Sequence, residues 1–250
     1  NFALDMNNVH GSIPTEISRL DSLRTLSMTR NHLSGKIPTE IITMPNLEHI
    51  FFYANMFIGS IPEEIGQATK LKSLRLENNL FFGTITKEIG KATNLEELSI
   101  GFNEFWRHIP TEIGLLTNLR WLVMEDNRLS GTLPTEFGMM SKLEYFLISK
   151  NLMVGPVPTE LARMTDLAEF RLAGTGMGGV FPKEMASLSK LHRLEMGSNN
   201  FQGTLRLSLL PLGISQCSNC LIPDTIMTEF GNMTGLSWLS MNDNDMTGKI

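Results

Sequence analysis

Hydrophobic positions recur along the chain every 24 residues, and the stretch 119–134, LRWLVMEDNRLSGTLP, shows the pattern clearly. Leu122, Val123 and Met124 are predicted to point in, out and in, as in a short strand with one buried face. Leu129 then returns to the interior, and Gly131 permits a backbone angle that other residues resist. The fixed period predicts a solenoid with one such strand in every coil.

Asparagine marks the register of the repeats. Steps of 24 residues from Asn127 reach asparagine in both directions except at Thr175, and the last matching asparagine lies 45 residues after Asn199. A side-chain amide carries one acceptor and two donors, which can satisfy backbone groups of its own coil and the next. We therefore predict a buried structural ladder formed by Asn7, Asn31, Asn55, Asn79, Asn103, Asn127, Asn151, Asn199 and Asn244.

The repeats resemble the plant-type leucine-rich repeat. Residues 23–47 and 95–119 follow its pattern LxxLxLxxNxLxGxIPxEIGxLxxL almost unaltered. Similar repeats occur in ectodomains of plant receptor-like kinases, in secreted polygalacturonase-inhibiting proteins and in large extracellular algal proteins, and the recurrent PTEIG is most similar to the algal repeats. The resemblance implies an α/β repeat fold: a right-handed solenoid with a parallel concave sheet and short 3-10 or helical turns on the convex side. It names no ligand.

We predict a single solenoid over residues 1–250, with about ten 24-residue coils. Both ends are expected to be truncated, because neither end has the features of a capping repeat. The 45-residue step predicts an insertion loop over residues 206–225, which contains Cys217 and Cys220. A zinc site would need about four ligands, and the histidines lie in other coils. A redox pair would need its own fold and an activated thiolate. We favour a disulfide between the two cysteines, formed in an oxidising compartment.

Composition narrows the class of protein. The net charge is −5 with dispersed Lys and Arg, which leaves no basic stripe for nucleic acid. No apolar run approaches the roughly 18 residues of a membrane span, so no span is expected within this segment. The sequon that begins at Asn232 predicts an exposed glycosylation site. Together with the cysteines, it favours an extracellular or cell-surface location.

Two apolar groups are predicted on the surface. On the concave sheet, the outward positions of consecutive coils carry an aromatic and aliphatic patch with two acidic residues at its edge: Phe102, Trp121, Val123, Tyr145 and Leu147, with Glu125 and Asp126. Such a patch is typical of an interaction site, although large rings also pack across strands for structural reasons alone. A possible lateral contact is formed by Ile58, Phe82 and Trp106.

A third set of outward positions, Arg24, Glu48, Lys72, Glu96, Arg120 and Glu144, alternates in charge and is predicted to support the sheet through cross-strand pairs.

These features favour a non-enzymatic recognition module that binds a protein, peptide or carbohydrate ligand through the concave face. The alternative is a structural cell-surface, matrix or fibre-forming protein that self-assembles through its lateral surface. No cofactor, metal site or catalytic set is predicted, because no Ser, His and Asp group and no carboxylate pair in a closed cleft can be placed on the repeats. Binding to ice is disfavoured, since Glu63, Lys87 and Lys183 interrupt the recurring threonines.

Overall fold

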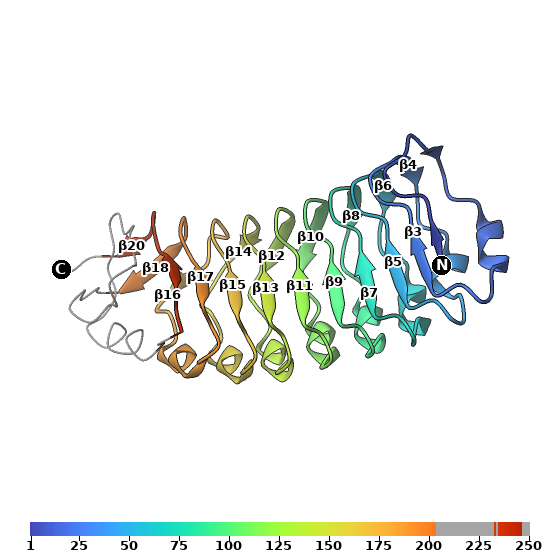
Figure 1. Ribbon diagram of the computed structural model, residues 1–250. Coiled ribbons are helices and arrows are strands. Elements are labelled where there is room, and N and C mark those ends of the chain that lie inside the picture. The colour runs from blue at the N-terminus through green and yellow to red at the C-terminus, as the bar shows by residue number, and fades with distance from the viewer. Residues whose placement is uncertain (204–232, 234, 247–250) are drawn as a thin grey trace.

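The computed structural model describes residues 1–203, 233 and 235–246. Each coil adds one strand to a long parallel sheet, and the coils stack into a curved row (Figure 1). The ten strands of this sheet are β1 (Phe2–Ala3), β3 (Thr25–Ser27), β5 (His49–Phe51), β7 (Ser73–Arg75), β9 (Glu97–Ser99), β11 (Trp121–Val123), β13 (Tyr145–Leu147), β15 (Glu169–Arg171), β17 (Arg193–Glu195) and β19 (Trp238–Ser240).

The register of this sheet follows the sequence repeat. Trp121 of β11 pairs with Glu97 on one side and with Tyr145 on the other, so each neighbour lies one 24-residue repeat away. The last step is different, because Arg193 of β17 pairs with Trp238 of β19, 45 residues further along the chain. The sheet therefore continues in register across the longer repeat, as the spacing of the asparagines predicts.

A second strand in each coil forms further parallel sheets. Seven of these strands make one sheet: β2 (His10–Gly11), β4 (His32–Gly35), β6 (Met56–Gly59), β8 (Leu80–Gly83), β10 (Glu104–His108), β12 (Arg128–Gly131) and β14 (Leu152–Met153). Another sheet contains β16 (Gly178–Gly179), β18 (Asn200–Gly203) and β20 (Asp245–Met246). The break between them falls at Thr175, the coil that lacks the ladder asparagine.

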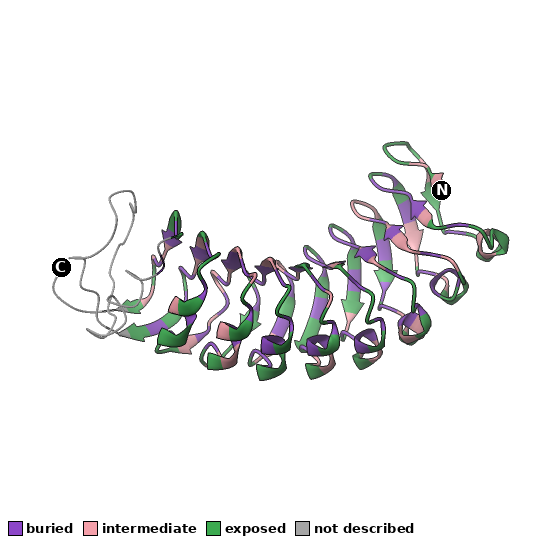
Figure 2. Ribbon diagram, turned by 60° about the horizontal axis from the view of Figure 1, so that its bottom comes forward, coloured by how far each residue is buried: buried purple, intermediate pink, exposed green. Residues whose placement is uncertain are grey.

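Short helices cover the convex side, on the outside of the arc in Figure 2. Most begin directly after a proline, whose fixed backbone angle suits the entry to a helical turn. They are η1 (Thr15–Arg19), α1 (Thr39–Ile42), η2 (Glu63–Gln67), η3 (Lys87–Lys91), η4 (Thr111–Leu115), η5 (Thr135–Met139), η6 (Thr159–Arg163) and η7 (Lys183–Ser187). The predicted solenoid with a parallel concave sheet and short convex helices is confirmed.

The core lies between the sheets and the helices. Its apolar side chains repeat from coil to coil, so that each buried residue packs on its equivalent in the next coil. Phe57, Phe81 and Phe105 illustrate this, because their rings stack in a row with centroids 6.1 and 6.2 Å apart. The buried residues form one continuous core beneath the long sheet.

Asn127 shows how the ladder works. Its side-chain Nδ2 donates to the carbonyls of Met124 at 3.2 Å and Glu125 at 3.4 Å in its own coil, and to Ile100 at 3.0 Å in the previous coil. Its Oδ1 accepts the amide hydrogen of Phe105, with an N···O distance of 2.9 Å. One side chain thus satisfies backbone groups of two coils at the turn that follows the strand.

The ladder changes at four places. Asn7, in the first coil, is exposed and bonds only to carbonyls of its own coil, because the described chain places no coil before it. Asn55 and Asn244 are half-buried, although both keep their bonds to the preceding coil. Thr175 is buried, and its hydroxyl donates to Leu172 and to Asn199. A hydroxyl cannot replace both ends of an amide, and the break between β14 and β16 falls at this coil.

Candidate functional site

Two aromatic side chains lie side by side on the concave face. Trp121 and Tyr145 are cross-strand partners, and their rings stack with centroids 3.9 Å apart at an interplanar angle of 23°. Trp121 remains 43% exposed, whereas Tyr145 is half-buried. The geometry is consistent with both interpretations of the sequence, cross-strand packing and an interaction site. The two rings pack against each other across the strands, and Trp121 also presents an aromatic surface to solvent.

The other members of the predicted patch differ in exposure. Val123 is half-buried, and Phe102 is 40% exposed at the turn that follows β9. Leu147 was expected to face solvent but is only 9% exposed, because Val123 and Arg171 flank it on the adjacent strands. Leu147 lines the groove with little of its surface exposed, so it offers less contact area than the sequence predicts.

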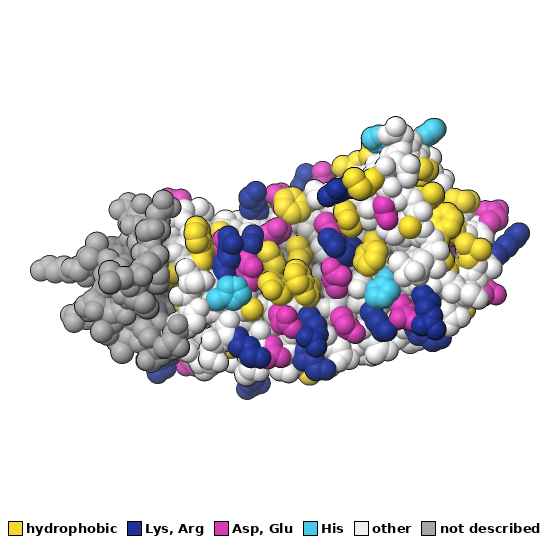
Figure 3. Space-filling model, viewed as in Figure 1, with side chains coloured by type: hydrophobic (Ala, Val, Ile, Leu, Met, Phe, Trp, Pro, Cys, Tyr) yellow, Lys and Arg dark blue, Asp and Glu magenta, His cyan; other side chains and the backbone are white. Residues whose placement is uncertain are grey.

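The patch lies in a shallow groove of about 720 Å³ along the concave face. Figure 3 shows hydrophobic side chains near the middle of this face, with charged side chains around them. Phe102, Glu125 and Arg171 also line a smaller hollow beside the groove, which includes Asp126 and Lys150. Glu125 therefore lines both the groove and the smaller hollow, whereas Asp126 lines the hollow alone.

Charged side chains surround the aromatic pair, and carboxylates outnumber guanidiniums. The lining of the groove contains five carboxylates and three guanidiniums: Glu77, Glu96, Glu97, Glu125 and Glu169, with Arg75, Arg120 and Arg171. Arg120 pairs with Glu144, at 2.6 Å, outside this lining. Arg171 pairs with Glu169 and lies 3.9 Å from Glu195. Arg120 and Arg171 are thus already paired with carboxylates, and the lining of the groove carries a net negative charge.

The side-chain carboxylate of Glu125 has no hydrogen bond or ion pair with the described residues, although Glu125 is half-buried. Burial raises the pKa of its carboxyl, and the positive charges of Arg171 and Lys150 offset part of this effect. Burial also raises the pKa of Glu97, against the influence of Arg75. Both carboxylates carry a desolvation penalty that no partner fully removes.

We expect Glu125→Gln to raise the stability of the protein at neutral pH. Because the folded-state pKa of Glu125 is raised, its protonated form adds stability below the ordinary glutamate pKa, and this stability is lost as pH rises through the folded value. The variant should melt about 1–3 °C higher than wild type at pH 7. The difference should shrink below about pH 4, where glutamate is protonated in both states. Thermal melts at both pH values check this, and an equal difference at the two values would contradict it.

The column of alternating charge forms ion pairs over part of its length. Glu48 binds Arg24 at 3.1 Å and Lys72 at 2.8 Å on the neighbouring coils. Arg120 and Glu144 form a further pair, as described above. Mostly solvated pairs of this kind contribute little individually to stability. Two residues of the column, Glu96 and Arg120, also line the groove.

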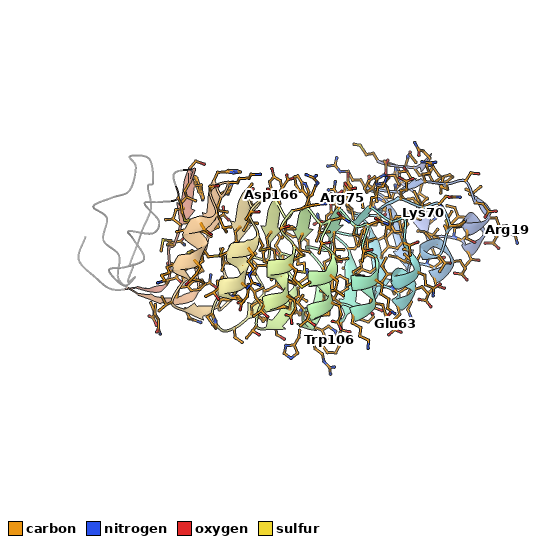
Figure 4. All side chains as sticks on the ribbon, turned by 90° about the horizontal axis from the view of Figure 1, so that it is seen from below. Arg19, Glu63, Lys70, Arg75, Trp106 and Asp166 are labelled. Atoms are coloured by element: carbon orange, nitrogen blue, oxygen red, sulfur yellow. The ribbon has the colours of Figure 1, made fainter. Side chains whose placement is uncertain are left out.

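The lateral surface carries a second apolar group. Ile58, Phe82 and Trp106 are 40%, 49% and 41% exposed, and Met56 and Leu80 beside them, which the sequence analysis omitted, are 43% and 51% exposed. We call these five residues the lateral patch. Figure 4 places Trp106 and Arg75 at opposite edges of the molecule, so this patch faces away from the groove. Next to Trp106, the guanidinium of Arg107 lies 4.7 Å from the indole ring centroid.

Several expected features lie outside the described residues. These are the insertion loop 206–225 with Cys217 and Cys220, and the glycosylation site at Asn232. Within the described part of the chain, no group of three or more His, Cys, Asp or Glu side chains could hold a metal ion. The same residues contain no helix with the length and hydropathy needed to cross a membrane.

The chain is similar to solved plant receptors. A structure of the plant peptide hormone receptor RGFR1 in complex with RGF2 is 31% identical with a TM-score of 0.83, and the match covers 96% of this chain and 39% of the receptor. The ectodomain of the Arabidopsis receptor kinase HAESA, in complex with an N-terminally extended IDA peptide hormone, is 30% identical with a TM-score of 0.86; that match covers 99% of this chain and 38% of the ectodomain.

The chain therefore spans about two fifths of the length of these receptors. No curated protein sequence matches it. The family model for the leucine-rich repeat matches residues 22–44 and 118–140. Together with the 24-residue period, the asparagine ladder and the parallel sheet, these matches identify the chain as a leucine-rich-repeat protein of the plant type.

Proposed function

We propose that the chain is a non-enzymatic recognition module of an extracellular or cell-surface protein, and that its groove binds a peptide or a protein segment. The observation that carries the proposal is the stacked Trp121–Tyr145 pair, which lines the groove with Trp121 exposed to solvent. Aromatic side chains of this kind commonly dominate binding energy, because they bury a large area at a small entropic cost.

The similar structures support a peptide as ligand. RGFR1 and HAESA were each solved with a peptide hormone, and a further HAESA structure, 26% identical to this chain, contains both the peptide IDA and the co-receptor SERK1. A parallel sheet with open outer positions suits an extended ligand, since successive coils present side chains at about 4.8 Å intervals. These similarities favour a peptide over a carbohydrate, and they do not support self-assembly.

The proposal predicts that Trp121→Ala combined with Tyr145→Ala weakens peptide binding by about 30-fold or more, which corresponds to about 2 kcal/mol. Peptides selected on the wild-type protein from a displayed random library provide the probe, and calorimetry gives the affinity. The fold should persist because both side chains lie on the outer face of the sheet, and a thermal melt verifies this.

The matched control is Phe82→Ala combined with Trp106→Ala, which removes two exposed rings from the lateral patch. It should leave the affinity for the selected peptides within about twofold of wild type, as substitutions outside a contact surface do. The opposite pattern of effects in the two double variants would contradict the proposal. If the lateral variant loses binding or self-association in light scattering, and the groove variant does not, the lateral patch is the working surface and the structural role is correct.

A further inference from the structure

Three hydrogen bonds join the sixth and seventh coils at the ladder. The N–H of Asn127 donates to the carbonyl of Lys150 at 3.2 Å. The N–H of Leu129 donates to Oδ1 of Asn151 at 3.0 Å, and Nδ2 of Asn151 donates to the carbonyl of Met124, also at 3.0 Å. One side-chain amide and the backbone beside it thus fasten the two coils together at the turn that follows the strand.

The junction between the seventh and eighth coils lacks these bonds. Within the described residues, none of the three has a counterpart there. Thr175 takes the place of the asparagine in the eighth coil, and its hydroxyl bonds Leu172 of its own coil and Asn199 of the ninth. The outer strands are interrupted at the same point, because β12 pairs with β14 and β16 pairs with β18, but β14 and β16 belong to different sheets.

The backbone beside Thr175 also differs from that of the other coils. Gly174 and Gly176 flank Thr175 with φ angles of 64° and 86°. The residue equivalent to Gly176 in the sixth coil is Arg128, which begins the outer strand β12. Glycine adopts positive φ without a steric penalty, so the chain on both sides of Thr175 changes its backbone angles more readily than the chain in a regular coil.

The concave side of the same junction is intact. Strands β13 and β15 pair in register, and the buried rings of Phe146 and Phe170 stack beneath them with centroids 5.1 Å apart. On the outer side, the N–H of Gly178 still donates to the carbonyl of Gly155 at 2.9 Å. A junction that is fastened along one side and weakly bonded along the other can turn about the fastened side.

The smaller hollow beside the groove crosses this junction. Its volume is about 370 Å³, and its lining includes Asp126 and Lys150 before the junction, with Gly174 and Ser198 after it. Asp126 and Lys150 form an ion pair at 3.3 Å, so this wall is held together on its own side. Gly174 directly precedes Thr175. A turn at the junction therefore changes the distance between the two walls of the hollow.

We propose that the junction between the seventh and eighth coils is a hinge of the solenoid, at which the eighth and following coils turn as a unit relative to the first seven and change the width of the smaller hollow. A hinge needs a few residues that absorb backbone rotation between parts that stay rigid. Paired outer strands hold the coils together on each side, and Gly174 and Gly176 supply the rotation. The hinge is a property of the fold, and it does not depend on which ligand the groove binds.

Hydrogen exchange in the native protein measures opening at the junction. The N–H of Gly178 bonds Gly155 across the hinge at 2.9 Å, and the N–H of Val154 makes the equivalent bond to Gly131 one coil earlier, at 2.8 Å. We expect Gly178 to exchange at least about tenfold faster than Val154 after correction for intrinsic rates, because local opening of the hinge breaks only the first bond. Equal protection of the two amides would overturn the hinge.

Thr175→Asn supplies the side-chain amide that the eighth coil lacks. It should slow the exchange of Gly178 about tenfold, toward the rate of Val154, because an amide can bond both coils. Thr159→Asn is the matched control, since it makes the same change at an exposed position at the start of η6. The control should leave the exchange of Gly178 within about twofold of wild type. If Thr175→Asn folds and Gly178 still exchanges as fast as in wild type, the missing amide does not open the junction and the proposal is wrong.

Distances between spin labels detect the turning itself and do not require the Thr175 variant to fold. Nitroxide amino acids are introduced in pairs at the exposed last residues of convex helices: Gln67 of η2 with Met139 of η5, and Leu115 of η4 with Ser187 of η7. Both pairs are three coils apart, but only the second pair spans the hinge. Double electron–electron resonance should give a distance distribution at least about twice as broad for the second pair. Equal widths would mean that the coils on both sides move as one body, which contradicts the hinge.

Discussion

Replacement of Asn127 by leucine is expected to lower the stability of the protein by about 3 kcal/mol or more. The buried side chain makes four hydrogen bonds, three as donor and one as acceptor, and leucine can make none of them. Each buried group left without a partner costs about 1–3 kcal/mol. The amide of Phe105 and the carbonyl of Ile100 are both enclosed between coils, so water cannot replace the lost amide without opening the stack.

The loss should lower the melting temperature by about 6–12 °C, at roughly 2–4 °C per kcal/mol for a chain of this size. Asn94→Leu is the matched control. That asparagine is exposed on the convex side and makes one hydrogen bond, to the carbonyl of Thr69 at 2.6 Å. Its replacement should change the melting temperature by no more than about 2 °C, as surface substitutions usually do. If Asn127→Leu melts like wild type, the ladder does not hold the coils together.

The sequence predicts the fold well because stacking constrains every coil in the same way. Leu122 and its equivalents must be apolar, the asparagines must bond two coils, and both requirements repeat every 24 residues. The longer spacing between Asn199 and Asn244 can be recognised in the sequence for the same reason, and the pairing of Arg193 with Trp238 agrees with it. Because the same packing and hydrogen-bonding requirements recur in every coil, the residues that meet them recur at a fixed spacing in the sequence.

The charge and contacts of the groove are harder to predict from the sequence, because they depend on side-chain geometry within single coils. Arg75 bonds Glu77, two residues away along its own coil, as well as Glu97 on the adjacent strand. A search for cross-strand pairs alone misses this arrangement. The lack of a partner for Glu125 likewise follows only once Arg171 is seen to be engaged with Glu169.

The backbone at the end of each strand of the concave sheet is a further feature that the repeat pattern does not reveal. The residue before each ladder asparagine has a positive φ, and this includes Ala54 at 57° and Phe102 at 53°. Non-glycine residues seldom adopt this conformation, so the turn is held by the surrounding bonds. Residue types at this position vary too widely to form a motif. The turn nevertheless decides where Phe102 stands at the edge of the groove.

Replacement of Gly114 by alanine is expected to destabilise the stack by about 1–3 kcal/mol, the usual effect of overpacking. Gly114 is buried in η4, and a Cβ atom there would lie 2.5 Å from the carbonyl oxygen of Glu136 and 2.7 Å from its carbonyl carbon. These are backbone atoms of the next coil, so they can move only if η5 separates from η4. Absence of a side chain at Gly114, and not a special backbone angle, therefore allows the two helices to pack closely.

Gly66→Ala provides the matched comparison, because Gly66 holds the same position in η2 but its added Cβ would lie 3.2 Å from the nearest backbone atom, the carbonyl oxygen of Glu88. Alanine gains the same intrinsic helical preference at both sites, at most about 1 kcal/mol, so the difference between the two variants isolates the contact between coils. Denaturant unfolding should show Gly66→Ala within about 0.5 kcal/mol of wild type and Gly114→Ala clearly below it. Equal stability of the two variants would mean that the coils can shift apart without loss, and that the close approach of the convex helices does not contribute to stability.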